Sequence, residues 1–139
     1  MTHQVQWRKE QFILDDDVGR LDVPTVCRLL WGTYWAAGRS KEQIVESLGH
    51  SLCLGMYVAQ EQIGFARAVT DYSTFTWLCD VVVDQAYRRR GLGKWMVDTL
   101  ITHPLLQTNQ LLGTRDAHSL YERFGFKRKE YMFREVRTR

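Results

Sequence analysis

The order of predicted helices and strands indicates a single domain of the α/β (α+β) class, with one mixed sheet and helices on both of its faces. Three observations predict this fold class. The chain has 139 residues, a length that suits one domain. Apolar residues change from helical spacing to strand-like runs near residue 50, and helix and strand patterns alternate from residue 75 onward. We therefore treat residues 1–139 as one domain.

The first part of the chain is predicted to hold a short strand and two helices. Residues 12–14 are apolar and precede three aspartates, which is typical of a strand that ends in a turn. Asp22 can cap a helix that starts with a proline in its first turn and that stops at Gly38. Ser40, with a glutamine three residues later, forms a capping-box pattern for a second helix, which ends at Gly49.

Three strands are predicted next, as a meander over residues 52–58, 63–69 and 75–83. The third contains a near-continuous apolar run, which is typical of a central strand that is covered on both faces. A loop over residues 84–90 follows, and then a helix over residues 91–102.

The last part of the chain is predicted to form two further strands around a short helix. Residues 111–113 follow Pro104 and have a short strand pattern. Residues 116–123 have a helical pattern with Gly125 as a natural stop. Residues 126–135 are predicted to form the final strand.

Composition excludes several classes of protein. The formal net charge is +3, which is too small to indicate nucleic-acid binding by charge alone. No apolar stretch approaches the roughly 18 residues of a membrane-spanning helix, and the first residues lack the apolar core of a signal peptide. The cysteines, Cys27, Cys53 and Cys79, are widely spaced without zinc-ligand spacing. We therefore expect a cytoplasmic protein with reduced buried thiols, no metal, and neither nucleic acid nor membrane as a partner.

The chemistry is concentrated in the loop that follows the longest predicted strand. There a run of apolar residues leads into a basic, glycine-containing loop that opens directly into a helix. Helix N-termini leave backbone N–H groups unpaired and carry positive partial charge, and glycines allow a phosphate to approach those groups. We interpret this loop as a pyrophosphate site made by Arg88, Arg89, Arg90, Gly91, Leu92, Gly93 and Lys94.

Two common nucleotide-binding motifs do not fit this loop. The spacing GxxxxGK[ST] of a Walker A loop is absent, and the third glycine of the dinucleotide fingerprint GxGxxG is missing after Gly93. A solvated basic loop with ordinary turn glycines remains the alternative to an anion site.

Two segments resemble the motifs of the GNAT-superfamily N-acetyltransferases. Residues 88–93 match the pattern Arg/Gln-x-x-Gly-x-Gly/Ala, and residues 117–126 resemble the pattern A-x-x-L-Y-x-x-x-G-F. The predicted element order agrees over nearly the whole chain. The resemblance implies a splayed central strand and transfer of an acetyl group from acetyl-CoA to a primary amine of a small molecule or peptide. It implies direct attack in a ternary complex, and also a homodimer, because members of the family are often dimers.

The resemblance also implies roles for individual residues. The backbone of Val81, Val82 and Val83 matches the stretch that pairs with the pantetheine arm of the cofactor, as an added strand does, while plain strand core is the alternative for their side chains. Tyr121 matches the tyrosine that protonates the departing thiolate, with core packing as its alternative. Ser119, beside it, and Thr114 are assigned to the cofactor site. Many members carry asparagine where Thr114 stands, so this chain departs from the family there.

Asp80 is our first candidate for the group that removes a proton from the amine. It lies in an otherwise apolar strand, and burial is expected to raise its pKa. A structural carboxylate bonded to the backbone or to an arginine is the equal alternative. Asp71 and Tyr72, in the preceding turn, are second candidates for contact with the substrate.

The acceptor pocket is expected between the first two helices and the meander, with Trp31, Tyr34 and Trp35 as candidate lining residues. Their helical spacing favours core packing for at least two of them. A ring that reaches the pocket would favour an aromatic or cationic amine. A non-catalytic acyl-CoA-binding or regulatory module on the same fold is the alternative function, because a fold does not fix an activity.

Overall fold

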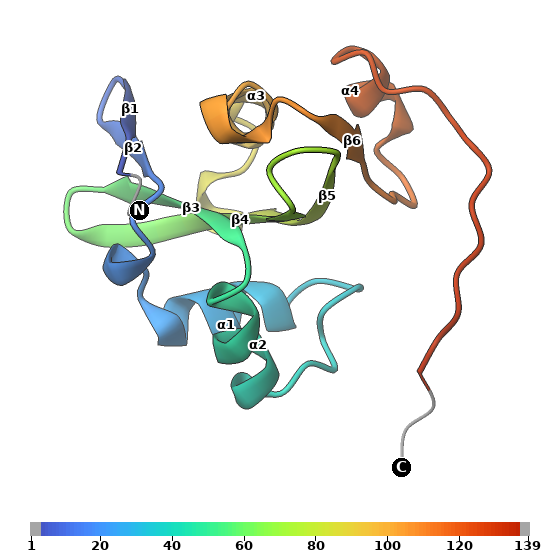
Figure 1. Cartoon of the computed structure of the whole chain (residues 1–139). Coiled ribbons are helices and arrows are strands. Elements are labelled where there is room, and N and C mark those ends of the chain that lie inside the picture. Colours follow the sequence, from blue (N-terminus) through green and yellow to red (C-terminus); the bar gives the residue numbers. More distant parts are fainter. Residues whose placement is uncertain (1–3, 137–139) are drawn as a thin grey trace.

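A mixed six-stranded sheet with helices on both faces forms the centre of the molecule in a computed structural model that describes residues 4–136 (Figure 1). The strands lie side by side in chain order, and the first five are antiparallel to their neighbours, whereas the last is parallel to the fifth. The predicted fold class is therefore confirmed. The strands are β1 (Gln6–Lys9), β2 (Phe12–Asp15), β3 (Leu52–Val58), β4 (Glu61–Thr70), β5 (Phe75–Val83) and β6 (Asn109–Leu111).

The helices divide between the two faces of the sheet. On one face lie α1 (Val23–Trp31) and α2 (Lys41–Leu48), and on the other lie α3 (Leu92–Ile101) and α4 (His118–Glu122) (Figure 1). The predicted caps are confirmed: the Asp22 carboxylate accepts a hydrogen bond from the Thr25 N–H, and Ser40 and Gln43 make both bonds of the capping box. Short 3₁₀ turns are η1 (Val18–Arg20), η2 (Gln85–Tyr87) and η3 (Pro104–Leu106).

Each face of the sheet has its own hydrophobic core. Since side chains alternate along a strand, Phe65 of β4 packs with α1 and α2, whereas its neighbour Ala66 packs with the α3 side. The first core contains Val26, Leu30, Ile44, Cys53, Phe65 and Val82, and the second contains Leu14, Leu54, Met56, Met96 and Leu100. The three cysteines are free thiols, of which Cys27 and Cys53 are buried and Cys79 is half-buried.

Some predicted boundaries are corrected by the structure. Strand β1 has no counterpart in the prediction, and β6 lies two residues earlier than expected. Helix α1 ends at Trp31, where Gly32 donates to the Leu29 and Leu30 carbonyls, and residues 33–38 form turns rather than a further helical stretch. The helical spacing of apolar residues up to Trp35 therefore does not reflect one continuous helix.

The predicted final strand over residues 126–135 is wrong, because residues 123–136 contain no strand. A strand needs a hydrogen-bonded neighbour. Here the segment passes the edge of the sheet at β6 without pairing with it, and a cavity separates the two.

Candidate active site

The strands β5 and β6 separate after three paired residues, and this splay defines the centre of the site. Pairing runs from Phe75 with Asn109 to Trp77 with Leu111 and extends no further. The rest of β5, through Val83, is paired only with β4. A register shift makes Cys79 an extra residue of β5 opposite β4, and such bulges bend a strand. The backbone of β5 beyond Cys79 is therefore open toward the side where β6 would continue.

A cavity of about 250 Å³ lies at the carboxyl end of this open backbone. It brings together most of the residues expected to bind the cofactor. Val81, Val82, Val83, Tyr87, Arg88, Arg89, Gly91, Leu92 and Gly93 line it. Arg90 and Lys94 are exposed and lie outside this lining, and the Arg90 guanidinium stands 5.4 Å from the centre of the Tyr87 ring.

The N-terminus of α3 opens at the same cavity without a side-chain cap. Gly91 is the N-cap, and its φ of 75° is in the left-handed region that favours glycine. Backbone N–H groups in the first turn of α3, including that of Gly93, are therefore available to an anion. The Arg88 Nε donates to the Val83 carbonyl over 3.1 Å and ties the loop to the end of β5.

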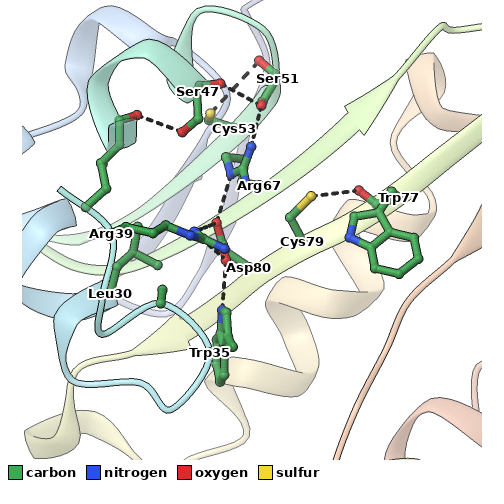
Figure 2. Close-up of polar contacts among 12 residues, drawn as sticks. Leu30, Trp35, Arg39, Ser47, Ser51, Cys53, Arg67, Trp77, Cys79 and Asp80 are labelled. Atoms are coloured by element: carbon green, nitrogen blue, oxygen red, sulfur yellow. Dashed lines mark hydrogen bonds and ion pairs between the residues drawn. The ribbon is translucent and has the colours of Figure 1, made fainter. Parts of the chain in front are cut away.

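A buried ionic cluster lies immediately before the open part of β5 (Figure 2). The Asp80 side chain, on a residue that is 1% exposed, accepts hydrogen bonds from Arg67 Nε at 2.8 Å and from Arg39 at 2.9 and 3.0 Å. The Trp35 Nε1 donates to the same carboxylate at 2.8 Å. The cluster thus links β5 to its neighbour β4 and to the loop between α1 and α2.

The expectation that the pKa of Asp80 is raised is wrong. Burial acts to raise it, but the hydrogen bonds and positive charges of Arg39 and Arg67 outweigh burial, and the pKa lies below its ordinary value. The geometry therefore favours the structural alternative for this carboxylate. Sequence reasoning named an arginine as a possible partner but identified neither Arg39 nor Arg67, although Arg67 is a lone charge in an apolar strand, and this was a usable signal.

The aromatic side chains at the end of α1 and just after it lie at the surface beside this cluster. Trp31, Tyr34 and Trp35 are 45%, 50% and 39% exposed, so the expectation of core packing for at least two of them is wrong. The early end of α1 explains the difference, since the last two residues stand on a loop. The Trp31 Nε1 donates to the Arg39 carbonyl at 2.7 Å, and the rings of Tyr34 and Trp35 meet edge to face at 5.1 Å.

Tyr121 lies on α4, half-buried and close enough to Tyr34 to interact electrostatically with it. Burial raises the pKa of Tyr121, and the neighbouring Tyr34 adds to the increase. The Tyr34 hydroxyl accepts a hydrogen bond from the Arg115 N–H at 3.2 Å, and the Arg115 guanidinium lies 3.8 Å from the centre of the Tyr34 ring. The α1–α2 loop is thus joined to the loop that precedes α4, a contact that sequence reasoning did not anticipate.

Tyr121 and Thr114 line a second, larger cavity of about 850 Å³ between β6, α4 and the C-terminal segment. They are therefore not on the same cavity as Val81–Val83. The Thr114 hydroxyl accepts a hydrogen bond from the Ala117 N–H at 3.0 Å and so helps to start α4. Ser119 is exposed and lies outside both linings.

Asp71 and Tyr72 form the turn between β4 and β5, at the opposite end of β5 from Val83. The Asp71 carboxylate accepts hydrogen bonds from the Thr74 hydroxyl and from the N–H groups of Ser73, Thr74 and Phe75, which hold its pKa well below the usual range. Both residues lie outside the two cavities described above. The Asp71 carboxylate therefore stabilises the turn between β4 and β5.

Comparisons with known proteins support the fold and identify the family. Residues 51–128 match the profile of the family described as "Acetyltransferase (GNAT) domain". A Xanthomonas campestris pv. campestris protein assigned to the GNAT family superposes with a TM-score of 0.85 at 36% identity, covering 90% of this chain and 93% of the other. The Gibberella zeae protein "Putative acetyltransferase FG08082" is 24% identical, over 91% of this chain and 85% of its own length.

A more distant relative shows the fold with a ligand. A GNAT family acetyltransferase from Elizabethkingia anophelis, solved with acetyl-CoA bound, has a TM-score of 0.67 at 18% identity and covers 88% of this chain and 80% of its own. The family match and these relatives support an acyltransferase. The chain belongs to the GNAT acetyltransferase family.

Two features are absent from residues 4–136. In that range no helix has the length and apolarity to cross a membrane. Nor do three or more histidine, cysteine, aspartate or glutamate side chains gather there in a way that could hold a metal ion.

Replacing Asp80 with asparagine tests the ionic cluster. Because a neutral amide at this position would leave two guanidinium groups without their counter-charge, we expect Asp80→Asn to lower the free energy of unfolding by about 3 kcal/mol at pH 7. The folded-state pKa of Asp80 is below its ordinary value of 3.8. The stabilisation is therefore complete above about pH 5 and is lost as the pH falls through the lowered pKa. Urea unfolding at a series of pH values measures both effects.

Asp84→Asn is the matched control, because Asp84 also pairs with an arginine, Arg28, at 3.0 Å but near the surface. Its cost should be about 1 kcal/mol or less. A loss for Asp80→Asn no larger than that of the control, or one that stays constant down to pH 2, would contradict the account.

Proposed function

We propose that this protein transfers an acetyl group from acetyl-CoA to a primary amine by direct attack in a ternary complex. The observation that carries the proposal is the open backbone of Val81–Val83, which lines one cavity together with a basic loop and an uncapped helix N-terminus. This combination suits a ligand with an amide-containing arm and a diphosphate.

Acetyl-CoA fits the groups that are present. Its pantetheine amides can pair with the backbone of Val81 and Val83 as a neighbouring strand would. Its diphosphate can lie against the N–H groups at the start of α3, with Arg88 and Arg89 supplying positive charge. A side chain at Gly91 would be strained by the positive φ, so this approach of the backbone to phosphate depends on glycine.

Tyr121 is proposed as the acid for the departing thiolate, which it would approach from the larger cavity beside β6, the neighbour of β5. Because its pKa is raised, the phenol carries its proton at neutral pH. When the amine nitrogen has bonded to the acetyl carbon, the carbon–sulfur bond breaks, and the thiolate takes the phenolic proton. The phenolate then recovers a proton from solvent. An N–H group of open β5 can stabilise the oxyanion that forms on the acetyl carbon.

We assign removal of the amine proton to solvent rather than to Asp80. A carboxylate that is held ionised by two arginines, and that is buried beside Trp35, is a weak base without access to an incoming amine. Asp80 is better described as a positioning residue, which holds the α1–α2 loop against β5.

The acceptor is proposed to bind beside the aromatic side chains at the end of α1 and in that loop. All three rings, those of Trp31, Tyr34 and Trp35, are exposed; Trp35 contacts Asp80, and Tyr34 lies near Tyr121. The Arg115 guanidinium over Tyr34 shows that this ring can take a cation on its face. Amines that carry an aromatic or second cationic group are therefore the first to test, in a panel of polyamines, aminoglycosides, amino acids and peptide N-termini.

Binding of acetyl-CoA should depend on Arg89. Arg89 lines the cavity and is exposed, so its removal takes away charge without disturbing the core. We expect Arg89→Ala to raise the Kd for acetyl-CoA by roughly 10- to 100-fold in calorimetric titration. Arg123→Ala, an exposed arginine outside this cavity, is the control and should change the Kd less than twofold. Equal effects of the two variants would contradict the assigned site.

Turnover should depend on the Tyr121 hydroxyl. We expect Tyr121→Phe to lower kcat by about 100-fold or more, as for loss of a general acid, while the Kd for acetyl-CoA changes less than twofold. Release of free thiol with the amine panel measures the rate. Tyr131→Phe, in the same large cavity but outside α4, is the control.

An unchanged kcat for Tyr121→Phe across the pH range would refute the acid role. Tight binding of acetyl-CoA without thiol release for any amine would favour the non-catalytic module instead.

A further inference from the structure

The cluster around Asp80 holds more positive than negative charge. Two guanidinium groups, those of Arg39 and Arg67, share the single carboxylate of Asp80 (Figure 2). The Arg67 side chain is 10% exposed, and it also donates a hydrogen bond to the Ser51 hydroxyl. The Arg39 side chain is the more accessible of the two, at 29% exposed. Arg39 is therefore the group that presents the surplus charge to an incoming molecule.

Arg39 uses only part of its guanidinium in this cluster. Its Nη1 donates to both oxygens of Asp80, whereas its Nη2 and Nε have no partner among residues 4–136. In the same part of the chain, the Tyr57 hydroxyl is the only buried polar side-chain atom without a partner. The Nη2 and Nε of Arg39 are therefore open to solvent. A planar guanidinium with two free donors can bind a carboxylate through two parallel hydrogen bonds.

These free donors lie beside the aromatic rings where the acceptor is proposed to bind. The Arg39 Nη1 and the Trp35 Nε1 donate to the same oxygen of Asp80, so the two side chains are adjacent. The Trp31 Nε1 donates to the Arg39 carbonyl at 2.7 Å. Asp80 is followed directly by the open backbone of Val81–Val83. A group bound to Arg39 would thus lie close to both the exposed rings and this strand.

A second arginine makes the same surface unfavourable for an acceptor with two positive charges. The Arg115 guanidinium lies 3.8 Å from the centre of the Tyr34 ring and forms no ion pair with another described residue. One face of Tyr34 is thus already occupied by a cation, and the ring of Tyr34 meets that of Trp35 next to Arg39. Repulsion between like charges rejects a ligand as effectively as attraction selects one. The surface therefore favours a negative group on the acceptor over a second positive one.

We propose that the acceptor is an amino acid or another primary amine that carries a carboxylate, and that Arg39 determines this specificity by binding the carboxylate through Nη2 and Nε. The inference rests on the proposed acetyl transfer and narrows the panel of acceptors given above. An aromatic group on the same molecule would add contact with the exposed rings of Trp31 and Trp35. Arg39 orients the acceptor and takes no part in the transfer of the acetyl group.

Matched pairs of acceptors isolate the effect of the carboxylate. Phenylalanine and phenethylamine, tryptophan and tryptamine, and lysine and cadaverine differ within each pair only by a carboxylate. Release of free thiol from acetyl-CoA gives kcat/KM for each compound. We expect kcat/KM to be at least about tenfold higher for the acid than for the amine in at least one pair, because charge-assisted hydrogen bonds to Arg39 are lost with the carboxylate.

Arg39→Lys tests whether Arg39 causes this preference. Lysine keeps a positive charge beside Asp80 but lacks the planar fork of donors, so the acid-to-amine ratio of kcat/KM should fall at least about fivefold. The difference in basicity between acid and amine cancels in this comparison of two proteins. A purely structural role for Arg39 would lower both rates of a pair equally and leave the ratio unchanged. Arg8→Lys is the control, because Arg8 is an exposed arginine on β1, at the opposite edge of the sheet from β6.

A binding measurement separates failure of this inference from failure of the proposed acetyl transfer. CoA has no acetyl group to transfer, so calorimetric titration of the CoA-loaded protein with each compound reports binding alone. We expect the acid to have a Kd at least about tenfold below that of its amine in at least one pair, and Arg39→Lys to remove most of the difference. Acid-selective binding without thiol release would refute acetyl transfer and keep the carboxylate site. No preference for the acid in any pair, or a preference that Arg39→Lys leaves unchanged, would overturn the inference.

Discussion

The short pairing between β5 and β6 is the constraint on which the rest of the site depends. Because the parallel ladder stops at Trp77 and Leu111, the carboxyl half of β5 keeps one row of backbone groups for a ligand. Buried backbone groups need partners, so this half of the strand is suited to binding an amide-containing molecule. The loop after Val83 then brings the N-terminus of α3 to the same edge, and one ligand can engage both.

The second constraint is the charge of Asp80. One ionised carboxylate connects β5 with Arg67 of β4 and with Arg39 and Trp35 of the α1–α2 loop. The interactions that make it an effective anchor also lower its pKa, and this makes it a poor base. In the proposed function, the acceptor side of the site is therefore held by an electrostatic cluster, whereas the cofactor side is formed by backbone groups. Substitutions around the Asp80 cluster can therefore leave the backbone groups of β5 unaltered. Such independence suits a fold on which many different functions are found.

Local patterns in the sequence predicted most of the fold. The capping box at Ser40, the meander of β3 to β5 and the glycine loop before α3 all depend on residues that are close together in the chain. Contacts between distant residues decide where α1 ends, which groups pair with Asp80, and why residues 126–136 stay unpaired. The spacing of apolar residues along the chain carries no information on such contacts. The final strand over residues 126–135 was predicted without considering whether an edge of the sheet was available to pair with it. Of the missed features, only Arg67 had a clear signal, a charge opposite Asp80 in adjacent apolar strands.

Amide hydrogen exchange at Val81, Val82 and Val83 tests the central claim most directly. If the pantetheine arm completes β5, saturating acetyl-CoA should slow exchange of the amide in this stretch that faces the β6 side by about tenfold or more. Adenosine diphosphate carries a diphosphate but no pantetheine arm, so it should leave that exchange rate unchanged while slowing exchange at the start of α3. Saturable binding of acetyl-CoA with unchanged exchange at all three valines would contradict the account.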